Sequence, residues 1–212
     1  MKLQVAIDRV SFEKAAKLVD EFEGIADVIE IGTSLIKDYG LLKLKDITDE
    51  VNKSKILGDI KTSDEGEYEF RQGFEQGFDI LTVMGSASFE TISKCYEVAE
   101  EYNKIMMIDL LECSKEKIND ISNFNNAIYC IHTSVDKERA ISIGDEIKKF
   151  NKEFPKIKNI AVAGGVKIDS IEELKKYGVE LVIVGSAITS SNDPKKVLES
   201  FKEAISYNES YR

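Results

Sequence analysis

The sequence predicts an α/β protein in which residues 1–212 form a single (β/α)8 TIM barrel domain. Short apolar runs rich in β-forming residues recur about every 20–30 residues, and nearly all are separated by longer segments with helical periodicity, as in parallel βα units. Eight such runs in a chain of 212 residues fit a closed barrel with short loops better than an open doubly wound sheet. A hydrophobic content of 42% with no shift in composition predicts one core.

The eight apolar runs are the candidate strands. They cover residues 3–8, 27–32, 55–61, 79–85, 105–111, 127–132, 159–164 and 181–185. Residues 12–22 follow Ser11, a suitable N-cap, and residues 89–102 carry apolar side chains at helical spacing, so both segments are predicted helices. Gly77 and Gly178 stand where helices should end before the next strand.

Charge and cysteine content exclude several classes of function. The net charge of -10 argues against binding to nucleic acid or to an anionic membrane, although a small anion can still bind locally. Cys95, Cys113 and Cys130 form no CxxC pair, so neither a disulfide framework nor a zinc site is indicated. The apolar runs are too short to span a bilayer, and the amino terminus leads directly into a strand. We therefore expect a cytoplasmic protein.

Charged residues stand at the carboxyl ends of five predicted strands. They are Asp8, Glu30, Asp59 with Lys61, Asp109 and His132. Any one of them alone can simply cap a turn. Six at the same end of one parallel sheet indicate a functional site, because the carboxyl ends of barrel strands carry the active site.

Asp59 and Lys61 are two residues apart, which places both side chains on one face of a strand and predicts an ion pair. Asp64 follows in the loop. Two carboxylates around one ammonium would keep Lys61 protonated, able to deliver a proton or to stabilise an enolate oxygen. The alternative is a purely structural salt bridge.

Glu30 and Asp59 come from neighbouring predicted strands and can supply the two carboxylates that Mg²⁺ commonly takes from a protein. A solvated or lysine-paired Glu30 is the alternative. His132 is the only histidine of the chain and suits a general base near neutral pH. It can equally be a hydrogen-bonded packing residue.

Glycine-containing turns follow the last two predicted strands. Gly165 lies after the seventh strand, and Gly185 with Ser186 lies after the eighth. In barrels these two loops often bind phosphate through backbone N–H groups. Each glycine alone can merely form a turn, but the pair predicts a local anion site.

Asp59, Lys61 and Asp64 form a DxKxxD motif. Together with residues 3–8, 28–33, 82–85, 131–133, 161–165 and 184–189, in this order, it makes nearly the whole chain resemble the orotidine 5'-monophosphate decarboxylase suprafamily. Within that suprafamily the chain is similar to the 3-hexulose-6-phosphate synthases, and next to the 3-keto-L-gulonate-6-phosphate decarboxylases. The resemblance implies a barrel of the ribulose-phosphate-binding type that acts on a phosphorylated sugar.

The resemblance also implies a homodimer with shared active sites and Mg²⁺ as cofactor. Asp8 would contact substrate, Glu30 and Asp59 would bind Mg²⁺, and Lys61 would flank a cis-enediolate derived from the sugar phosphate. Asp64 would be lent across the dimer interface.

In the synthase reaction, His132 would remove a C1 proton from D-ribulose 5-phosphate, and the enediolate would add to formaldehyde. The resemblance also makes Asp109 a candidate substrate-binding residue. Asp109 favours the synthase, because the decarboxylases tend to carry Glu at this position. They also tend to carry an Arg soon after the strand-six histidine, which residues 133–136 lack.

The chain departs from the family in two places. Residues 137–142 have a helical pattern directly after Asp136, where the family usually has a short glycine-containing stretch before its helix. Ser186 stands where some relatives place Arg. The phosphate would then be held by backbone N–H groups and the Ser186 hydroxyl. The alternatives are the decarboxylase reaction and a barrel that binds a sugar phosphate without turnover.

Overall fold

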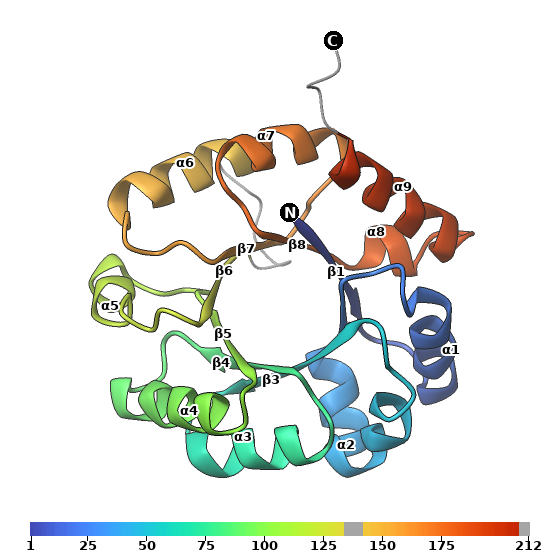
Figure 1. Ribbon diagram of the computed structural model, residues 1–212, viewed down its shortest axis with the longest axis horizontal. Coiled ribbons are helices and arrows are strands. Elements are labelled where there is room, and N and C mark those ends of the chain that lie inside the picture. The colour runs from blue at the N-terminus through green and yellow to red at the C-terminus, as the bar shows by residue number, and fades with distance from the viewer. Residues whose placement is uncertain (134–141, 208–212) are drawn as a thin grey trace.

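The computed structural model describes residues 1–133 and 142–207, and within them eight parallel strands close into a barrel in chain order (Figure 1). The predicted (β/α)8 fold is confirmed. The strands are β1 (Lys2–Ile7), β2 (Val28–Ile31), β3 (Lys55–Thr62), β4 (Ile80–Met84), β5 (Ile105–Asp109), β6 (Ile128–His132), β7 (Ile160–Ala163) and β8 (Leu181–Val184).

The helices form an outer ring around the strands (Figure 1). They are α1 (Phe12–Phe22), α2 (Thr33–Thr48), α3 (Gly66–Glu75), α4 (Phe89–Glu101), α5 (Lys115–Asp120), α6 (Ile143–Glu153), α7 (Ile171–Lys176), α8 (Ser186–Thr189) and α9 (Pro194–Ser206), with a 3-10 turn, η1 (Ile168–Ser170), before α7. None of the helices in the described ranges is long and apolar enough to cross a membrane.

The predicted elements agree with the structure at their boundaries to within two residues for every strand. Helix α1 covers the predicted residues, and the Ser11 hydroxyl accepts a hydrogen bond from the Lys14 N–H at 3.3 Å. Gly77 and Gly178 follow α3 and α7 with φ of 93° and 74°, the left-handed conformation that ends a helix. The predicted helical start at residues 137–141 lies outside the described residues.

Alternation along the strands divides the apolar side chains into two groups. Leu3, Val5 and Ile7 of β1 belong to the large core between strands and helices. The side chains between them point into the barrel, where Ala6 packs against a smaller cluster that includes Leu57. This arrangement leaves the inward positions at the two ends of the strands to line the two mouths of the barrel.

Candidate functional site

The predicted charged residues do meet at the carboxyl-terminal mouth of the barrel. Asp8 directly follows β1, whereas Asp109 and His132 are the last residues of β5 and β6. The Lys61 ammonium forms ion pairs with Asp59 at 3.2 Å and with Asp109 at 2.6 Å. The predicted Asp59–Lys61 pair is therefore confirmed, and Lys61 joins β3 to β5 across the mouth.

A regular strand would bring Asp59 and Lys61 together by alternation alone, but β3 is irregular at this point. The register between β3 and β4 shifts between Gly58 and Thr62, and Lys61 has a φ of 49°. A bulge of this kind turns side chains toward a site, and a left-handed non-glycine residue is costly unless its surroundings hold it. The pair thus depends on the bulge rather than on simple alternation.

Thr82 of β4 closes the bulge. Its hydroxyl accepts a hydrogen bond from the Lys61 N–H at 2.9 Å and donates one to the Asp59 carboxylate at 2.8 Å. The other Asp59 oxygen accepts from the Thr33 hydroxyl at 2.6 Å. The two threonines fix the carboxylate in front of the Lys61 ammonium.

Asp64 does not contribute the second carboxylate around Lys61 within this chain, contrary to the expectation from the motif. Asp64 is exposed, and its carboxylate accepts the N–H of Glu65 at 2.9 Å. Asp109 takes that place instead, because the bulge directs the Lys61 side chain toward β5. Burial lowers the pKa of the Lys61 ammonium, but the charges of Asp59 and Asp109 outweigh it and hold that pKa above its ordinary value.

Asp109 links Lys61 to His132. The His132 Nδ1 lies 3.0 Å from one Asp109 oxygen and 3.2 Å from the other, and the carboxylate also accepts the Leu111 N–H at 3.0 Å. Burial alone would raise the pKa of Asp109, but hydrogen bonding to His132 and the charge of Lys61 lower it to about 2. Asp109 is ionised at neutral pH and 3% exposed; its direct contact with substrate stays a prediction.

Glu30 lies in a different electrostatic environment. It is buried inside the barrel mouth and accepts a hydrogen bond from the Gln4 amide at 2.5 Å. Burial, followed by the negative charge of Asp59, raises the pKa of Glu30 to about 8. The Glu30 and Asp59 carboxylates therefore repel each other when both are ionised. A divalent cation bound between them would relieve this repulsion.

The donor set at Glu30 and Asp59 fits Mg²⁺. Over residues 1–133 and 142–207 there is no group of three or more His, Cys, Asp or Glu side chains arranged for a metal ion. Mg²⁺ commonly takes only one or two protein carboxylates and fills its octahedron with water and substrate oxygens. Glu30 and Asp59 would hold it.

Asp8 is held at the edge of the same mouth. Its carboxylate accepts the Ser34 N–H at 3.0 Å and also the Ser34 hydroxyl. A Cβ atom on Gly32 would lie 2.7 Å from the Asp8 carboxyl carbon, so a glycine is needed for this approach. The exposed Asp8 side chain is thus fixed at the rim of the mouth; its contact with substrate stays a prediction.

The two predicted phosphate loops have open space beside their glycines. Gly165 has a φ of 70°, and a Cβ atom there would meet nothing within 4 Å. A Cβ atom on Gly185 would meet only Ala6, at 3.7 Å. Ser186 is the exposed first residue of α8. The structure leaves room for an anion beside these residues.

Three residues that hold the charged side chains of the site were not predicted from the sequence: Gln4, Thr33 and Thr82. Gln4 and Thr82 are polar residues between apolar neighbours in strands, and both are buried. A buried polar side chain at an inward strand position needs a polar partner. That pattern was the available signal, whereas nothing in the sequence distinguishes Thr33.

Comparisons with known proteins agree with this geometry. Residues 1–201 match the model of the orotidine 5'-phosphate decarboxylase / HUMPS family. A 3-hexulose-6-phosphate synthase of Bacillus subtilis (strain 168) is 33% identical over 213 residues, which cover 97% of this chain and 99% of the relative. A crystal structure of 3-hexulose-6-phosphate synthase is similar with a TM-score of 0.88 and 31% identity, covering 97% of this chain and 100% of that one.

A 3-keto-L-gulonate-6-phosphate decarboxylase from Vibrio cholerae O1 biovar El Tor str. N16961 shares the fold with a TM-score of 0.85. The identity to that structure is 22%, with 96% of each chain covered. At this level the likeness concerns the fold alone.

Proposed function

The chain belongs to the orotidine 5'-phosphate decarboxylase / HUMPS family, and on that premise we propose that it is a Mg²⁺-dependent 3-hexulose-6-phosphate synthase. The enzyme would condense formaldehyde with D-ribulose 5-phosphate. The observation that carries the proposal is the connected series Asp59–Lys61–Asp109–His132, in which a protonated amine and a histidine share one ionised carboxylate.

His132 serves as the base in this proposal. Because the Asp109 carboxylate is ionised and only accepts hydrogen bonds, the neutral imidazole must carry its proton on Nδ1. Nε2 then keeps its lone pair. That nitrogen takes the C1 proton of the sugar phosphate, and Asp109 stabilises the imidazolium that results.

Lys61 stabilises the enediolate. Removal of the C1 proton leaves an electron pair shared between C1 and the C2 oxygen, and the fixed ammonium offers positive charge to that oxygen. The C1 carbon then forms a bond to the formaldehyde carbon, and the formaldehyde oxygen takes the proton held by the His132 imidazolium to become a hydroxyl. Mg²⁺, held by Glu30 and Asp59, would supply further positive charge for the substrate oxygens.

Substrate binding in this proposal uses the rim of the mouth. The backbone N–H groups at Gly165, Gly185 and Ser186, with the Ser186 hydroxyl, hold the phosphate, and Asp8 accepts from a sugar hydroxyl. The loops leave open space for the anion, and their backbone N–H groups would take the role that Arg has at the Ser186 position in some relatives.

A second copy of the chain completes the site in this proposal. Asp64 is exposed rather than turned toward Lys61, so it is available to a partner's mouth. Tyr68, four residues further on, is 64% exposed, and Phe89 is 48% exposed. Tyr68 lies in the first turn of α3, directly after the Asp64 loop, and a large exposed side chain there supports an interface.

A side-by-side assay tests the proposal. Incubation with ribulose 5-phosphate, formaldehyde and Mg²⁺ should consume formaldehyde, and EDTA should stop the reaction. The same protein should release little CO₂ from 3-keto-L-gulonate 6-phosphate. A higher kcat/KM for CO₂ release would establish the decarboxylase instead, and tight ribulose 5-phosphate binding with neither reaction would establish a non-catalytic barrel.

A further inference from the structure

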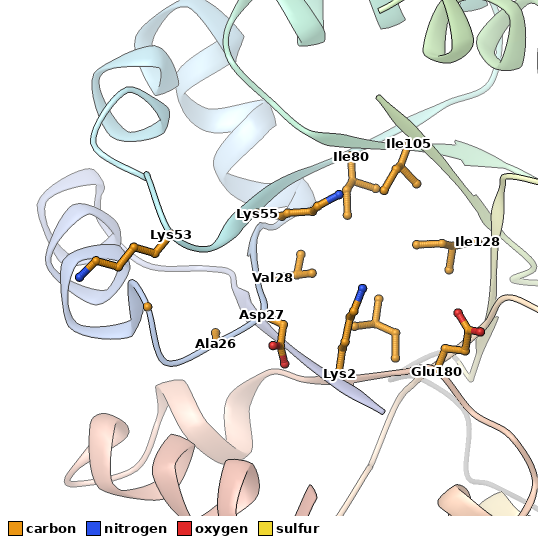
Figure 2. A pocket seen from close by; sticks show the side chains of 12 residues that line it. Lys2, Ala26, Asp27, Val28, Lys53, Lys55, Ile80, Ile105, Ile128 and Glu180 are labelled. Atoms are coloured by element: carbon orange, nitrogen blue, oxygen red, sulfur yellow. The ribbon is translucent and has the colours of Figure 1, made fainter. Parts of the chain in front are cut away.

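A pocket of about 340 Å³ opens at the amino-terminal mouth of the barrel, opposite the charged site (Figure 2). Its floor consists of aliphatic side chains at strand starts: Val28, Ile80, Ile105, Ile128 and Leu181. Lys2 and Lys55, the first residues of β1 and β3, complete the lining at strand starts. The strand starts therefore form most of the lining, and the loops before β2, β3 and β8 add the rest.

The two lysines explain why the pocket exists. Bulky apolar side chains normally fill each layer inside such a barrel. An ammonium group cannot stay unpaired in an apolar layer, so a lysine at this level extends toward water and leaves the layer unfilled. Figure 2 shows Lys2 and Lys55 extending over the aliphatic floor, whereas Lys53 points away from it.

The charges at this mouth are unbalanced. Within the described part of the chain, Lys2, Lys53 and Lys55 have no carboxylate within the 4.0 Å of an ion pair. Asp27 lines the pocket, but it is engaged by Lys202 at 2.5 Å and by the Leu3 N–H at 2.8 Å. Glu180 is the other acid in the lining. In a protein of net charge -10, this is a local excess of positive charge over an apolar surface.

We propose that this pocket binds a small organic anion with an aliphatic or aromatic body. The anionic head lies between the ammonium groups of Lys2 and Lys55, and the body lies on the aliphatic floor. Glu180 repels the head and so orients it toward the lysines. The volume is at the lower end of small-molecule pockets, which span roughly 300–1,000 Å³. A sugar phosphate fits poorly, because the floor offers its hydroxyls no partners.

Fluorescence titration with 8-anilinonaphthalene-1-sulfonate, an anion with an aromatic body, tests this site on the whole protein. Decanoate should displace the probe, and ribulose 5-phosphate should not. The double variant Lys2→Gln/Lys55→Gln should weaken binding about tenfold, a loss of about 1.4 kcal/mol. Lys53→Gln is the matched control. It also removes one positive charge beside the pocket, but the Lys53 side chain points away from the floor, so the affinity of this variant for the probe should equal that of the wild type.

A second variant separates the pocket from other apolar surface. Ile105→Trp fills the floor and should abolish probe binding while circular dichroism and formaldehyde consumption stay unchanged. Equal affinity in the wild type and in either pocket variant would overturn the proposal, as would displacement of the probe by ribulose 5-phosphate. The result is independent of the proposed reaction, because the probe assay contains no formaldehyde.

Discussion

The two mouths of the barrel use lysine in opposite ways. At the carboxyl-terminal mouth, Lys61 is held between Asp59 and Asp109, both of them buried. At the amino-terminal mouth, Lys2 and Lys55 are exposed and lie over aliphatic side chains. A fixed, paired ammonium suits the stabilisation of charge that develops during a reaction. An exposed ammonium without an ion pair, beside an apolar floor, suits reversible binding.

The largest effect expected from this contrast concerns Lys61. Lys61→Ala should lower kcat/KM for formaldehyde consumption by about three orders of magnitude or more, because it removes the positive charge that we propose stabilises the enediolate and leaves Asp59 and Asp109 without their cation. Steady-state kinetics measures the loss. Lys55→Ala, the same change at the other mouth, should retain wild-type activity; equal losses in both variants would contradict the division of roles.

His132 should come next in magnitude. His132→Asn should reduce kcat by about 10²–10⁴, the usual contribution of a general base. The direct measurement is exchange of the C1 proton of ribulose 5-phosphate with deuterated solvent, followed by NMR without formaldehyde. Asp109→Asn should slow the same exchange less, because a neutral amide holds the ring but no longer stabilises the imidazolium. Exchange at the wild-type rate in His132→Asn would assign the proton transfer to another group.

Glu30 should make stability depend on pH in the metal-free protein. Its pKa is about 8 in the folded state against an ordinary value of 4.5, so between these values the folded state binds a proton that the unfolded chain has released. The free energy of unfolding should therefore fall as pH rises from about 4.5 to about 8, by a few kcal/mol, since one pKa unit is about 1.4 kcal/mol.

Urea unfolding in EDTA at several pH values checks this slope. Glu30→Gln should lack it, because the amide does not titrate. Glu90→Gln, a change at an exposed glutamate, should keep it. The same slope in Glu30→Gln and the wild type would show that another group causes the slope and that folding does not raise the pKa of Glu30.

The smallest expected effect is at Thr82. Thr82→Val removes the hydroxyl that joins the Lys61 N–H to Asp59 and should cost about 1–3 kcal/mol of stability, the usual penalty for an unsatisfied buried group. It should also lower kcat more than it changes KM. Thr82→Ser restores the hydroxyl and should recover activity. Unchanged kcat in the valine variant would show that the bulge keeps its conformation without the Thr82 hydroxyl.

The barrel was predictable because the pattern of an apolar strand followed by a helical segment is repeated eight times along the chain. An error in the boundary of one strand does not change the number of strands. The Asp59–Lys61 pair was also predictable, because the two residues are close in the sequence, although the structure forms the pair through a bulge and not through regular strand alternation. Asp109 as the second partner of Lys61 was not, since it depends on a bulge whose register involves Thr82 on another strand. The amino-terminal pocket was not predictable for a similar reason. Lys2 and Lys55 are ordinary charged residues in the sequence, and they come to line one pocket only when the barrel closes.

Barrel closure also has a consequence for folding kinetics. The first strand pairs with the last, with Lys2 opposite Leu181 and Val5 opposite Val184. Contacts between segments this distant in sequence form slowly, because the entropy of a long loop is lost before they are gained. Asp59 and Lys61 can meet early, but the loop after β8, where we propose that phosphate binds, comes beside the end of β1 only when the ring closes. Recovery of enzymatic turnover during refolding therefore reports ring closure, and it should lag behind the recovery of helical circular dichroism.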